Sequence, residues 1–325
     1  MKRFLLAIFA FFLLQTSAIA QNENGLWITI LRADGLLTPI ARFDGGNWIN
    51  TWPETDNLTF DTNDNPSNPP TKWQWSTTQI PKEWVVFTID GKKSFITGNE
   101  PVLYSSHCGI NWGLKTDYPS DKEGRHNPAK VGIAVNQDMD FLPATLDKSP
   151  ALKLPLLSYL NDKFSMNEAI GIQRAEKKQK TSGDRLSYTG HPIDKSVREL
   201  QPFSVNRLEH IKGIDDKINL YAFSIDRKYQ KPANFSDQSC SAISHYSGLV
   251  FQDTSGSYHS FYDELAITDC DGKGSSFLEL LGAFKVGGEW FQIRRTTYYE
   301  SEYIYIDKIE EDGPKRVAGI FVGGC

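Results

Sequence analysis

Tight turns between short alternating stretches constrain this chain more than any other feature of its sequence. Runs of alternating apolar and polar residues stop at Asp34-Gly35, Gly45-Gly46, Asp90-Gly91 and Gly287-Gly288. Two-residue hairpin turns need positive φ, which glycine adopts without steric cost. The pattern therefore predicts a mainly β fold built from antiparallel hairpins.

The stretch ARFDGGNW, residues 41–48, shows this pattern most clearly. With Gly45-Gly46 in the turn, Phe43 and Trp48 become cross-strand neighbours on one face. Arg42 then lies opposite Ile49 on the other face. An aromatic pair beside a tight turn explains Trp48 by packing alone.

A weak internal repeat bears on how the hairpins are arranged. Residues 41–48 (ARFDGGNW) and 283–290 (AFKVGGEW) share the pattern A-x-x-x-G-G-x-W. Repeated antiparallel hairpins are typical of propellers and also of stacked sandwiches or barrels. We therefore keep two architectures open: a propeller-like ring of hairpins, or paired β-sandwich or barrel units.

One region departs from the strand pattern and predicts a small helical insertion. An apolar stripe at helical spacing marks it. The stripe consists of Leu156, Leu157, Leu160 and Phe164. Residues 175–192 are polar and contain turn formers, which predicts an exposed loop or an inserted hairpin. The expected regions are an N-terminal β region (21–145), a helical and loop insertion (146–200) and a C-terminal β region (201–325).

The first twenty residues have the three parts of an export signal. The start, MKR, is positive, residues 4–14 are apolar, and Ala18 and Ala20 have the spacing of a cleavage site. The apolar run is shorter than the roughly 18–20 residues of a spanning helix. We expect a signal peptide over 1–20, cleavage before Gln21, and a soluble protein in the periplasm or outside the cell, without stable membrane insertion.

Charge and aromatic content narrow the classes of partner. The formal net charge of −5 becomes −7 once Lys2 and Arg3 leave with the signal. An acidic exported protein is a poor candidate for binding nucleic acid, since that binding depends on neutralising phosphates. Aromatic residues make up 12% of the chain and include 8 Trp. Such a content suits sheet packing and also surfaces that bind carbohydrate or protein.

The cysteines predict two disulfides. Four cysteines remain after export, and an even number in an oxidising compartment is typical of disulfide pairing. We favour Cys240–Cys270, which are close in sequence, and this leaves Cys108–Cys325. No pair has the CxxC spacing of a zinc site.

Calcium is the one cofactor for which the sequence offers candidate ligands. Asp269 and Asp271 flank Cys270 and share one face if the segment is extended. Two like charges at that distance favour a cation or solvent. The alternative is an exposed turn that the disulfide pins, with no cofactor. The segment DTNDNP (61–66) resembles an oxygen-ligand loop, but Pro66 stands where the loop needs Gly.

The sequence contains no motif of a catalytic site. The six histidines lack HExxH spacing, the serines lack G-x-S-x-G, and no phosphate-binding glycine loop opens a helix. His245 and His259 are expected on two paired strands. Asp263, Glu264 and Glu279 are available for hydrolytic chemistry, but so are many other carboxylates.

Tryptophans are the candidate ligand-binding residues. Five of them lie between residues 48 and 84. Exposed aromatic rings bind sugar faces and peptide side chains, whereas buried rings fill sheet interfaces. Packing is the default interpretation for each ring. Trp52, Trp73 and Trp75 are the candidates for facing a ligand, because Trp73 and Trp75 share a face when extended and Trp52 lies just past its strand.

Two segments resemble a set of uncharacterised exported bacterial proteins. They are ADGLLTPIARFDGGNW (33–48) and ITDCDGK (267–273). The resemblance covers the N-terminal hairpins and the surroundings of Cys270. It implies export, and it carries no known activity and no catalytic residues.

The expected function is that of an exported, soluble binding or structural module with a carbohydrate or protein ligand, rather than an enzyme. The alternative is a carboxylate-dependent hydrolase that acts on polysaccharide or peptide in a β cleft. Convergent buried acids with raised pKa in a pocket would favour the hydrolase. A flat aromatic patch without such acids would favour binding.

Overall fold

The computed structural model describes residues 25–50, 80–106, 109–120, 130–147, 154–182, 190–215, 218–230, 240–270, 272–299 and 301–324. Within these ranges strands dominate, every sheet is antiparallel, and two helices are present. The prediction of a mainly β fold of antiparallel hairpins is therefore confirmed. The predicted signal peptide lies outside the described residues.

The first part of the described chain forms the N-terminal sheet. It has eight strands in the order β5-β4-β8-β1-β2-β7-β6, with β3 paired to β2. The strands are β1 (Leu26–Arg32), β2 (Leu36–Asp44), β3 (Asn47–Asn50), β4 (Glu83–Thr88), β5 (Lys93–Thr97), β6 (Glu100–Ser106), β7 (Gly109–Lys115) and β8 (Lys130–Val135).

The N-terminal sheet curls around a core of its own. Trp84 of β4 and Leu114 of β7 share one buried cluster, although these strands are not neighbours in the sheet. Beyond the ends of β5 and β7, the backbone N–H of Asp117 donates to the carbonyl of Thr97 (2.9 Å). The Thr97 hydroxyl donates in return to the Asp117 carboxylate (2.8 Å). These contacts make the sheet barrel-like.

Strand β1 is buried along its whole length because both of its faces are covered. Successive side chains of a strand point to opposite faces. Ile28 and Ile30 face the C-terminal half of the protein, and Trp27 and Leu31 face the interior of the curled sheet. A strand buried on both faces is expected to consist almost entirely of apolar residues, as LWITIL does.

A second sheet carries the helices, and we call it the helix-bearing sheet. Its five strands follow the order β10-β11-β12-β13-β14. They are β10 (Thr145–Leu146), β11 (Ser204–Ile214), β12 (Ile218–Tyr229), β13 (Ala242–Gln252) and β14 (Tyr258–Asp269). The helices are α2 (Leu154–Ser182) and α3 (Lys195–Glu199).

Helix α2 packs on one face of the helix-bearing sheet through the apolar stripe that the sequence predicts. Leu156, Leu160 and Phe164 are buried against residues of β11, β12 and β13. For residues 175–182 the expectation of a loop or hairpin is wrong, since the helix continues to Ser182. The polar residues there are good helix formers, and Glu176 pairs with Lys180 one turn later.

The third sheet, the C-terminal sheet, has the order β18-β17-β16-β15-β9. Its strands are β9 (Phe141–Pro143), β15 (Ser276–Val286), β16 (Glu289–Tyr298), β17 (Ser301–Glu310) and β18 (Gly313–Gly324). Strand β9 reaches it from the N-terminal part of the chain.

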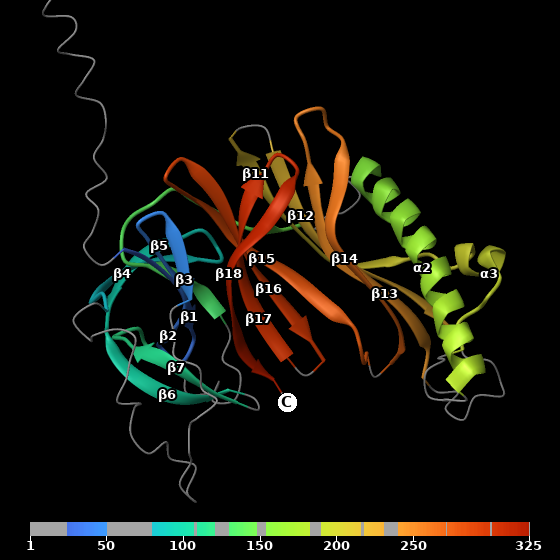
Figure 1. The fold of residues 1–325 in the computed structure, drawn as a ribbon, viewed down its shortest axis with the longest axis horizontal. Coiled ribbons are helices and arrows are strands. Elements are labelled where there is room, and N and C mark those ends of the chain that lie inside the picture. The colour runs from blue at the N-terminus through green and yellow to red at the C-terminus, as the bar shows by residue number, and fades with distance from the viewer. Residues whose placement is uncertain are drawn as a thin grey trace, which may run out of the picture.

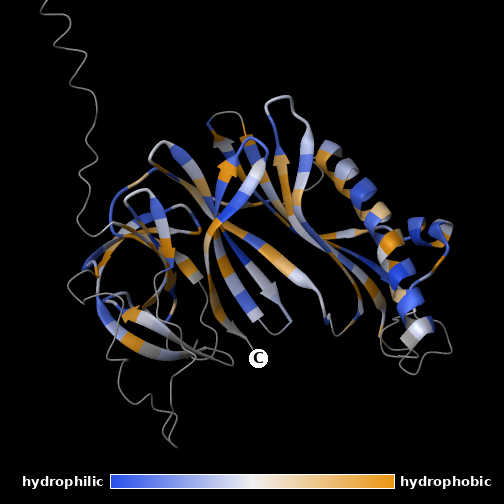
Figure 2. Ribbon diagram, viewed as in Figure 1, coloured by the Kyte–Doolittle hydropathy of each residue, from blue (hydrophilic) through white to orange (hydrophobic). Residues whose placement is uncertain are grey.

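The three sheets and α2 stack as layers, with the C-terminal sheet in the middle (Figure 1). One of its faces packs against the N-terminal sheet, where Phe284, Ile293 and Ile304 are buried. Its other face packs against the helix-bearing sheet, where Leu280 meets Leu249. Hydrophobic and hydrophilic residues alternate along many of these strands (Figure 2). Of the two architectures left open by the sequence, the barrel and sandwich units describe this stack.

The hairpin of β2 and β3 has the predicted register. Phe43 pairs with Trp48, and Arg42 pairs with Ile49. The ring centroids of Phe43 and Trp48 lie 5.1 Å apart. The other three predicted turns also join paired strands, namely β1 with β2, β4 with β5, and β15 with β16.

Candidate functional site

Several of the predicted site residues lie outside the described residues. These are Trp52, Trp73, Trp75, Asp271, Cys108 and Cys325. Asp269 is described, and it is a half-buried residue at the end of β14. Within the described residues, no group of three or more His, Cys, Asp or Glu side chains could hold a metal ion.

The predicted bond between Cys240 and Cys270 is present, with 5.4 Å between the Cα atoms. Its cysteines lie two residues before Ala242 and one residue after Asp269, which are cross-strand partners in β13 and β14. The bond therefore closes the hairpin at the end opposite its turn.

The described tryptophans of the predicted cluster are packing residues. Trp84 is 1% exposed, and its ring nitrogen donates to the carbonyl of Gly98 (2.8 Å). Trp48 is half-buried, with its ring 5.2 Å from that of Phe291 in the C-terminal sheet. These two rings fill a sheet interior and a sheet interface.

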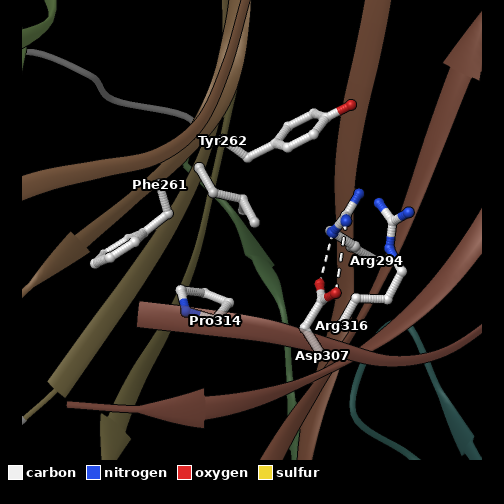
Figure 3. Close-up of a pocket in the computed structure, with 7 residues that line it drawn as sticks. Phe261, Tyr262, Arg294, Asp307, Pro314 and Arg316 are labelled. Carbon is white, nitrogen blue, oxygen red and sulfur yellow. Dashed lines mark hydrogen bonds and ion pairs between the residues drawn. The ribbon is translucent and has the colours of Figure 1, made fainter. Parts of the chain in front are cut away.

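A pocket of about 210 Å³ lies where the helix-bearing sheet and the C-terminal sheet diverge. Strands β13 and β14 supply one side of it, and β16, β17 and β18 supply the other (Figure 3). The lining residues are Leu249, Phe261, Tyr262, Arg294, Asp307, Pro314 and Arg316.

A buried ion pair forms the charged floor of this pocket. Arg294 and Asp307 are 3% and 2% exposed, and Nε of Arg294 lies 2.6 Å from Oδ2 of Asp307. The amide of Gln292 donates to the same carboxylate oxygen (3.0 Å). A second guanidinium nitrogen of Arg294 donates to the hydroxyl of Thr296 (2.9 Å). The guanidinium is therefore fixed on two sides.

Arg316 brings a second guanidinium group to the same place. It is exposed, and its guanidinium carbon lies 3.7 Å from the ring centroid of Tyr305. Arg294 lies over the same ring at 4.4 Å. Figure 3 shows the two guanidinium groups side by side above Asp307. The pocket lining thus holds two cations and one carboxylate.

Tyr262 lines the pocket, and Tyr298 and Tyr305 contact its lining residues. Arg294 lies 4.9 Å from the ring centroid of Tyr262, whose hydroxyl is 3.0 Å from the hydroxyl of Tyr298. Burial and this hydrogen bond raise the pKa of Tyr298. Burial also raises the pKa of Tyr305, although both arginines oppose the shift. The hydroxyls of Tyr298 and Tyr305 therefore stay protonated at neutral pH.

Strand alternation explains why these residues share a face. In β16, Phe291 and Ile293 point toward the N-terminal sheet, so Gln292 and Arg294 point the other way. Sequence reasoning missed this site. Its signal is an arginine at an inward position of an otherwise ordinary strand, FQIRRTTY, and the strand alone does not show which sheet faces it.

The carboxylates named for the hydrolase do not converge in one place. Asp263 accepts hydrogen bonds from Tyr246 (2.5 Å) and Ser260 (3.0 Å). The neighbouring Glu264 points to the opposite face of β14, because the two residues are adjacent in a strand. Glu279 is paired with Arg207 and Arg295.

Glu209 is a buried acid with a raised pKa, and it forms an ion pair with Arg207. Burial raises the pKa of Glu209, although Arg207 opposes the shift. Arg207 donates to both Glu209 (2.6 Å) and Glu279 (2.5 Å), so one cation links the two carboxylates. The other oxygen of Glu209 accepts the backbone N–H of Leu280 (2.8 Å). These contacts tie the two sheets together.

A second buried charge cluster anchors α2. Glu168 is fully buried and pairs with Arg227 (2.6 Å), and the hydroxyl of Tyr229 donates to it (2.6 Å). Arg198 of α3 lies 3.7 Å from the same carboxylate. Glu168 of α2 thus contacts Arg227 and Tyr229 of β12 and also Arg198 of α3. The cluster therefore positions both helices on the helix-bearing sheet.

Comparisons with protein-family models, with curated proteins and with solved structures found no match. Neither described helix combines the length and the apolar composition that crossing a membrane requires.

Proposed function

We propose that this protein is an exported, non-enzymatic binding module. Its pocket between the helix-bearing and C-terminal sheets takes a carboxylate, or a similar small oxyanion, of the ligand. The observation that carries this proposal is the pair of guanidinium groups of Arg294 and Arg316 over Tyr305. Among the described lining residues, the one carboxylate is that of Asp307, so the two guanidinium groups leave one positive charge for a ligand.

The donors of Arg294 support anion recognition. A guanidinium group carries five N–H donors in a rigid fork that matches a carboxylate. Three of them are used in the bonds to Asp307 and Thr296. The other two donors belong to the same fixed group, so the side chain loses less conformational entropy when a ligand binds.

The size of the pocket supports a small group rather than a whole large ligand. Pockets for drug-sized ligands measure roughly 300–1,000 Å³. At about 210 Å³, this pocket suits one ring-sized or terminal group. The aromatic rings of Phe261 and Tyr262 offer that group an apolar wall.

The hydrolase alternative receives less support from the same residues. Glycoside cleavage by carboxylates uses two acids that flank the scissile bond. Among the lining residues that the structure describes, Asp307 is the one acid, and its oxygens accept hydrogen bonds from Arg294 and Gln292. A carboxylate held in this way is a poor general acid or base.

Export is part of the proposal. It is supported by the MKR start and apolar run of residues 1–20 and by the Cys240–Cys270 bond, a feature typical of oxidising compartments. The N-terminus of the protein recovered from the periplasm or medium tests it, with Gln21 expected as the first residue. Protein retained in the cytoplasm with residues 1–20 intact would refute export.

The binding proposal is tested by calorimetric titration of the purified protein with galacturonate, glucuronate and sulfate. The neutral sugars galactose and glucose serve as comparison ligands. We expect the anions to bind and the neutral sugars to bind at least tenfold more weakly, because a hydrogen bond to a charged group contributes about 1.5–3 kcal/mol.

The matched variants are Arg316→Gln and Lys315→Gln. Both remove one positive charge from adjacent exposed positions of β18, but the two side chains point to opposite faces. Arg316→Gln should weaken anion binding by about tenfold or more, and Lys315→Gln should leave it unchanged. Equal effects of the two substitutions, or no anion binding at millimolar concentration, would refute the proposal.

A further inference from the structure

A row of aromatic rings leads away from the arginine pocket along the C-terminal sheet. Tyr305, beneath both guanidinium groups, lies 5.8 Å from Tyr303, and their ring planes differ by only 2°. Tyr303 in turn lies 5.3 Å from Phe321. We call these three residues the aromatic shelf. Phe321 is 49% exposed, so the far end of the shelf is open to solvent.

Strand pairing places the shelf on the same face as the pocket. Tyr303 and Tyr305 precede Asp307 at alternate positions of β17, so all three side chains share one face. Phe321 is the cross-strand partner of Tyr303 in β18. The shelf therefore continues the surface on which the ion pair lies.

Gly319 allows Tyr305 to lie flat on β18. The two residues are cross-strand partners. A Cβ atom at position 319 would lie 2.5 Å from Cδ1 of the Tyr305 ring, which is closer than any real contact. A side chain there would tilt the ring that carries both arginines. The glycine thus leaves room for the ring that lies under both guanidinium groups.

We propose that the ligand is an acidic oligosaccharide, with a uronate carboxylate at Arg294 and Arg316 and the following sugar rings stacked on Tyr303 and Phe321, the part of the aromatic shelf beyond Tyr305. This inference rests on the proposed function of the arginine pocket. Sugar rings present flat faces of C–H groups, which pack on aromatic rings, and hydroxyl edges, which accept from tyrosine O–H groups. Phe321, whose ring lies 5.3 Å from that of Tyr303 and is 49% exposed, extends this surface beyond the ring that the arginines cover.

An extended peptide fits this surface less well. Peptides that bind along sheets add to an unpaired strand edge through main-chain hydrogen bonds. The edge strand of this sheet, β18, contacts β2 and β3 of the N-terminal sheet. The backbone N–H of Gly319 donates there to the side chain of Asn50 (3.5 Å). The shelf itself offers ring faces rather than a strand edge.

The test is calorimetric titration with galacturonic acid and with its linear dimer and trimer. The trimer should bind about tenfold more tightly than the monomer, because about one additional sugar ring stacks on an aromatic ring. Phe321→Ala should leave monomer binding unchanged and remove the gain with length. Arg316→Gln should weaken monomer and trimer by the same factor.

Tyr303→Leu is the second shelf variant, and it keeps apolar bulk while removing the flat ring. It should also remove the gain with length. Unchanged thermal unfolding of both variants shows that the shelf, and not the fold, has been altered. Phe321→Ala carries little folding risk because the side chain is about half exposed.

The outcomes separate the two proposals. A trimer that binds no more tightly than the monomer, while Arg316→Gln still weakens both, overturns the oligosaccharide inference and leaves the anion pocket standing. Absence of all anion binding overturns both. An acidic tripeptide that matches the trimer and depends equally on Phe321 overturns the assignment to saccharide.

Discussion

Arg294 and Asp307 lie side by side on β16 and β17, with 2.6 Å between Nε and Oδ2, and neither side chain is more than 4% exposed. Removing charges from water costs several kcal/mol per ion, and the partner must compensate for that cost. The pair is therefore both the support of the proposed pocket and a condition for a stable C-terminal sheet.

Asp307→Asn should lower the free energy of unfolding by about 3–5 kcal/mol, because it leaves the guanidinium of Arg294 buried with its charge uncompensated. Urea unfolding at pH 7 measures the loss. Asp138→Asn is the control, since Asp138 pairs with Lys93 at 65% and 39% side-chain exposure. Exposed pairs contribute little, so equal losses in the two variants would contradict the prediction.

Trp48→Ala should destabilise the protein by about 3–5 kcal/mol, the usual range for removing a packed aromatic ring. The ring lies 5.1 Å from Phe43, 5.2 Å from Phe291 and 6.0 Å from Phe284, and so joins two sheets. Trp48→Phe should retain most of the stability. Phe95→Ala, at a position that is 73% exposed, is the control and should unfold like the wild type. A fully stable Trp48→Ala variant would show that the ring is dispensable for packing.

Replacing both Cys240 and Cys270 by Ser should cost about 3–4 kcal/mol in the chain-entropy account of a loop of this length. The bond spans a sequence separation of 30 residues. Guanidinium chloride unfolding of the variant and of the oxidised wild type measures the difference. Non-reducing peptide mapping is the independent check, and free thiols at both positions would refute the bond.

The contact between Asp226 and His245 predicts a loss of stability in acid. Oδ1 of Asp226 lies 2.6 Å from Nδ1 of His245, and Nε2 of His245 lies 2.7 Å from the carbonyl oxygen of Ser276. Both neighbours of the ring, a carboxylate and a backbone carbonyl, are hydrogen-bond acceptors. Burial alone raises the pKa of Asp226, but hydrogen bonds from His245 and Asn206 outweigh it, so the pKa lies below its ordinary value of 3.8.

A lowered carboxyl pKa stabilises the folded state fully above the unfolded value, and this contribution is lost as the pH falls through the folded value. The wild type should therefore be more stable than Asp226→Asn at pH 5–7, and the two should converge below about pH 4. Thermal unfolding between pH 2 and pH 7 measures the convergence. Asp312→Asn, at an exposed position, is the control and should follow the wild type throughout. A constant difference between wild type and Asp226→Asn across this range would contradict the prediction.

Features that depend on neighbours along the chain could be predicted from the sequence. The Gly45-Gly46 turn determines that Phe43 pairs with Trp48, because a two-residue turn sets the register. The stripe from Leu156 to Phe164 identifies the buried face of α2. Closeness in sequence predicts the bond between Cys240 and Cys270, and a single hairpin brings the two residues together.

The candidate pocket could not be predicted in this way. Phe261 and Arg294 come from strands of different sheets, and Asp307 comes from a third strand. Alternation shows that a strand has two faces, but it does not show which face another sheet will cover or where two sheets diverge. The tyrosines of β17 are visible as an alternating run, yet their position beside two arginines depends on how β16 and β18 pair with that strand.

The two hairpins that share the repeat show which features depend on local sequence and which depend on tertiary contacts. The shared A-x-x-x-G-G-x-W pattern gives both the same local turn, with Phe43 opposite Trp48 and Lys285 opposite Trp290. Trp48 nevertheless packs between two sheets, whereas the ring nitrogen of Trp290 donates to Asp215 (2.7 Å). Local sequence specifies the turns, the registers and the alternation, because these depend on φ, ψ and nearest neighbours. The stacking of the sheets specifies what each tryptophan ring contacts and where two arginines meet, because those contacts join residues far apart in the chain.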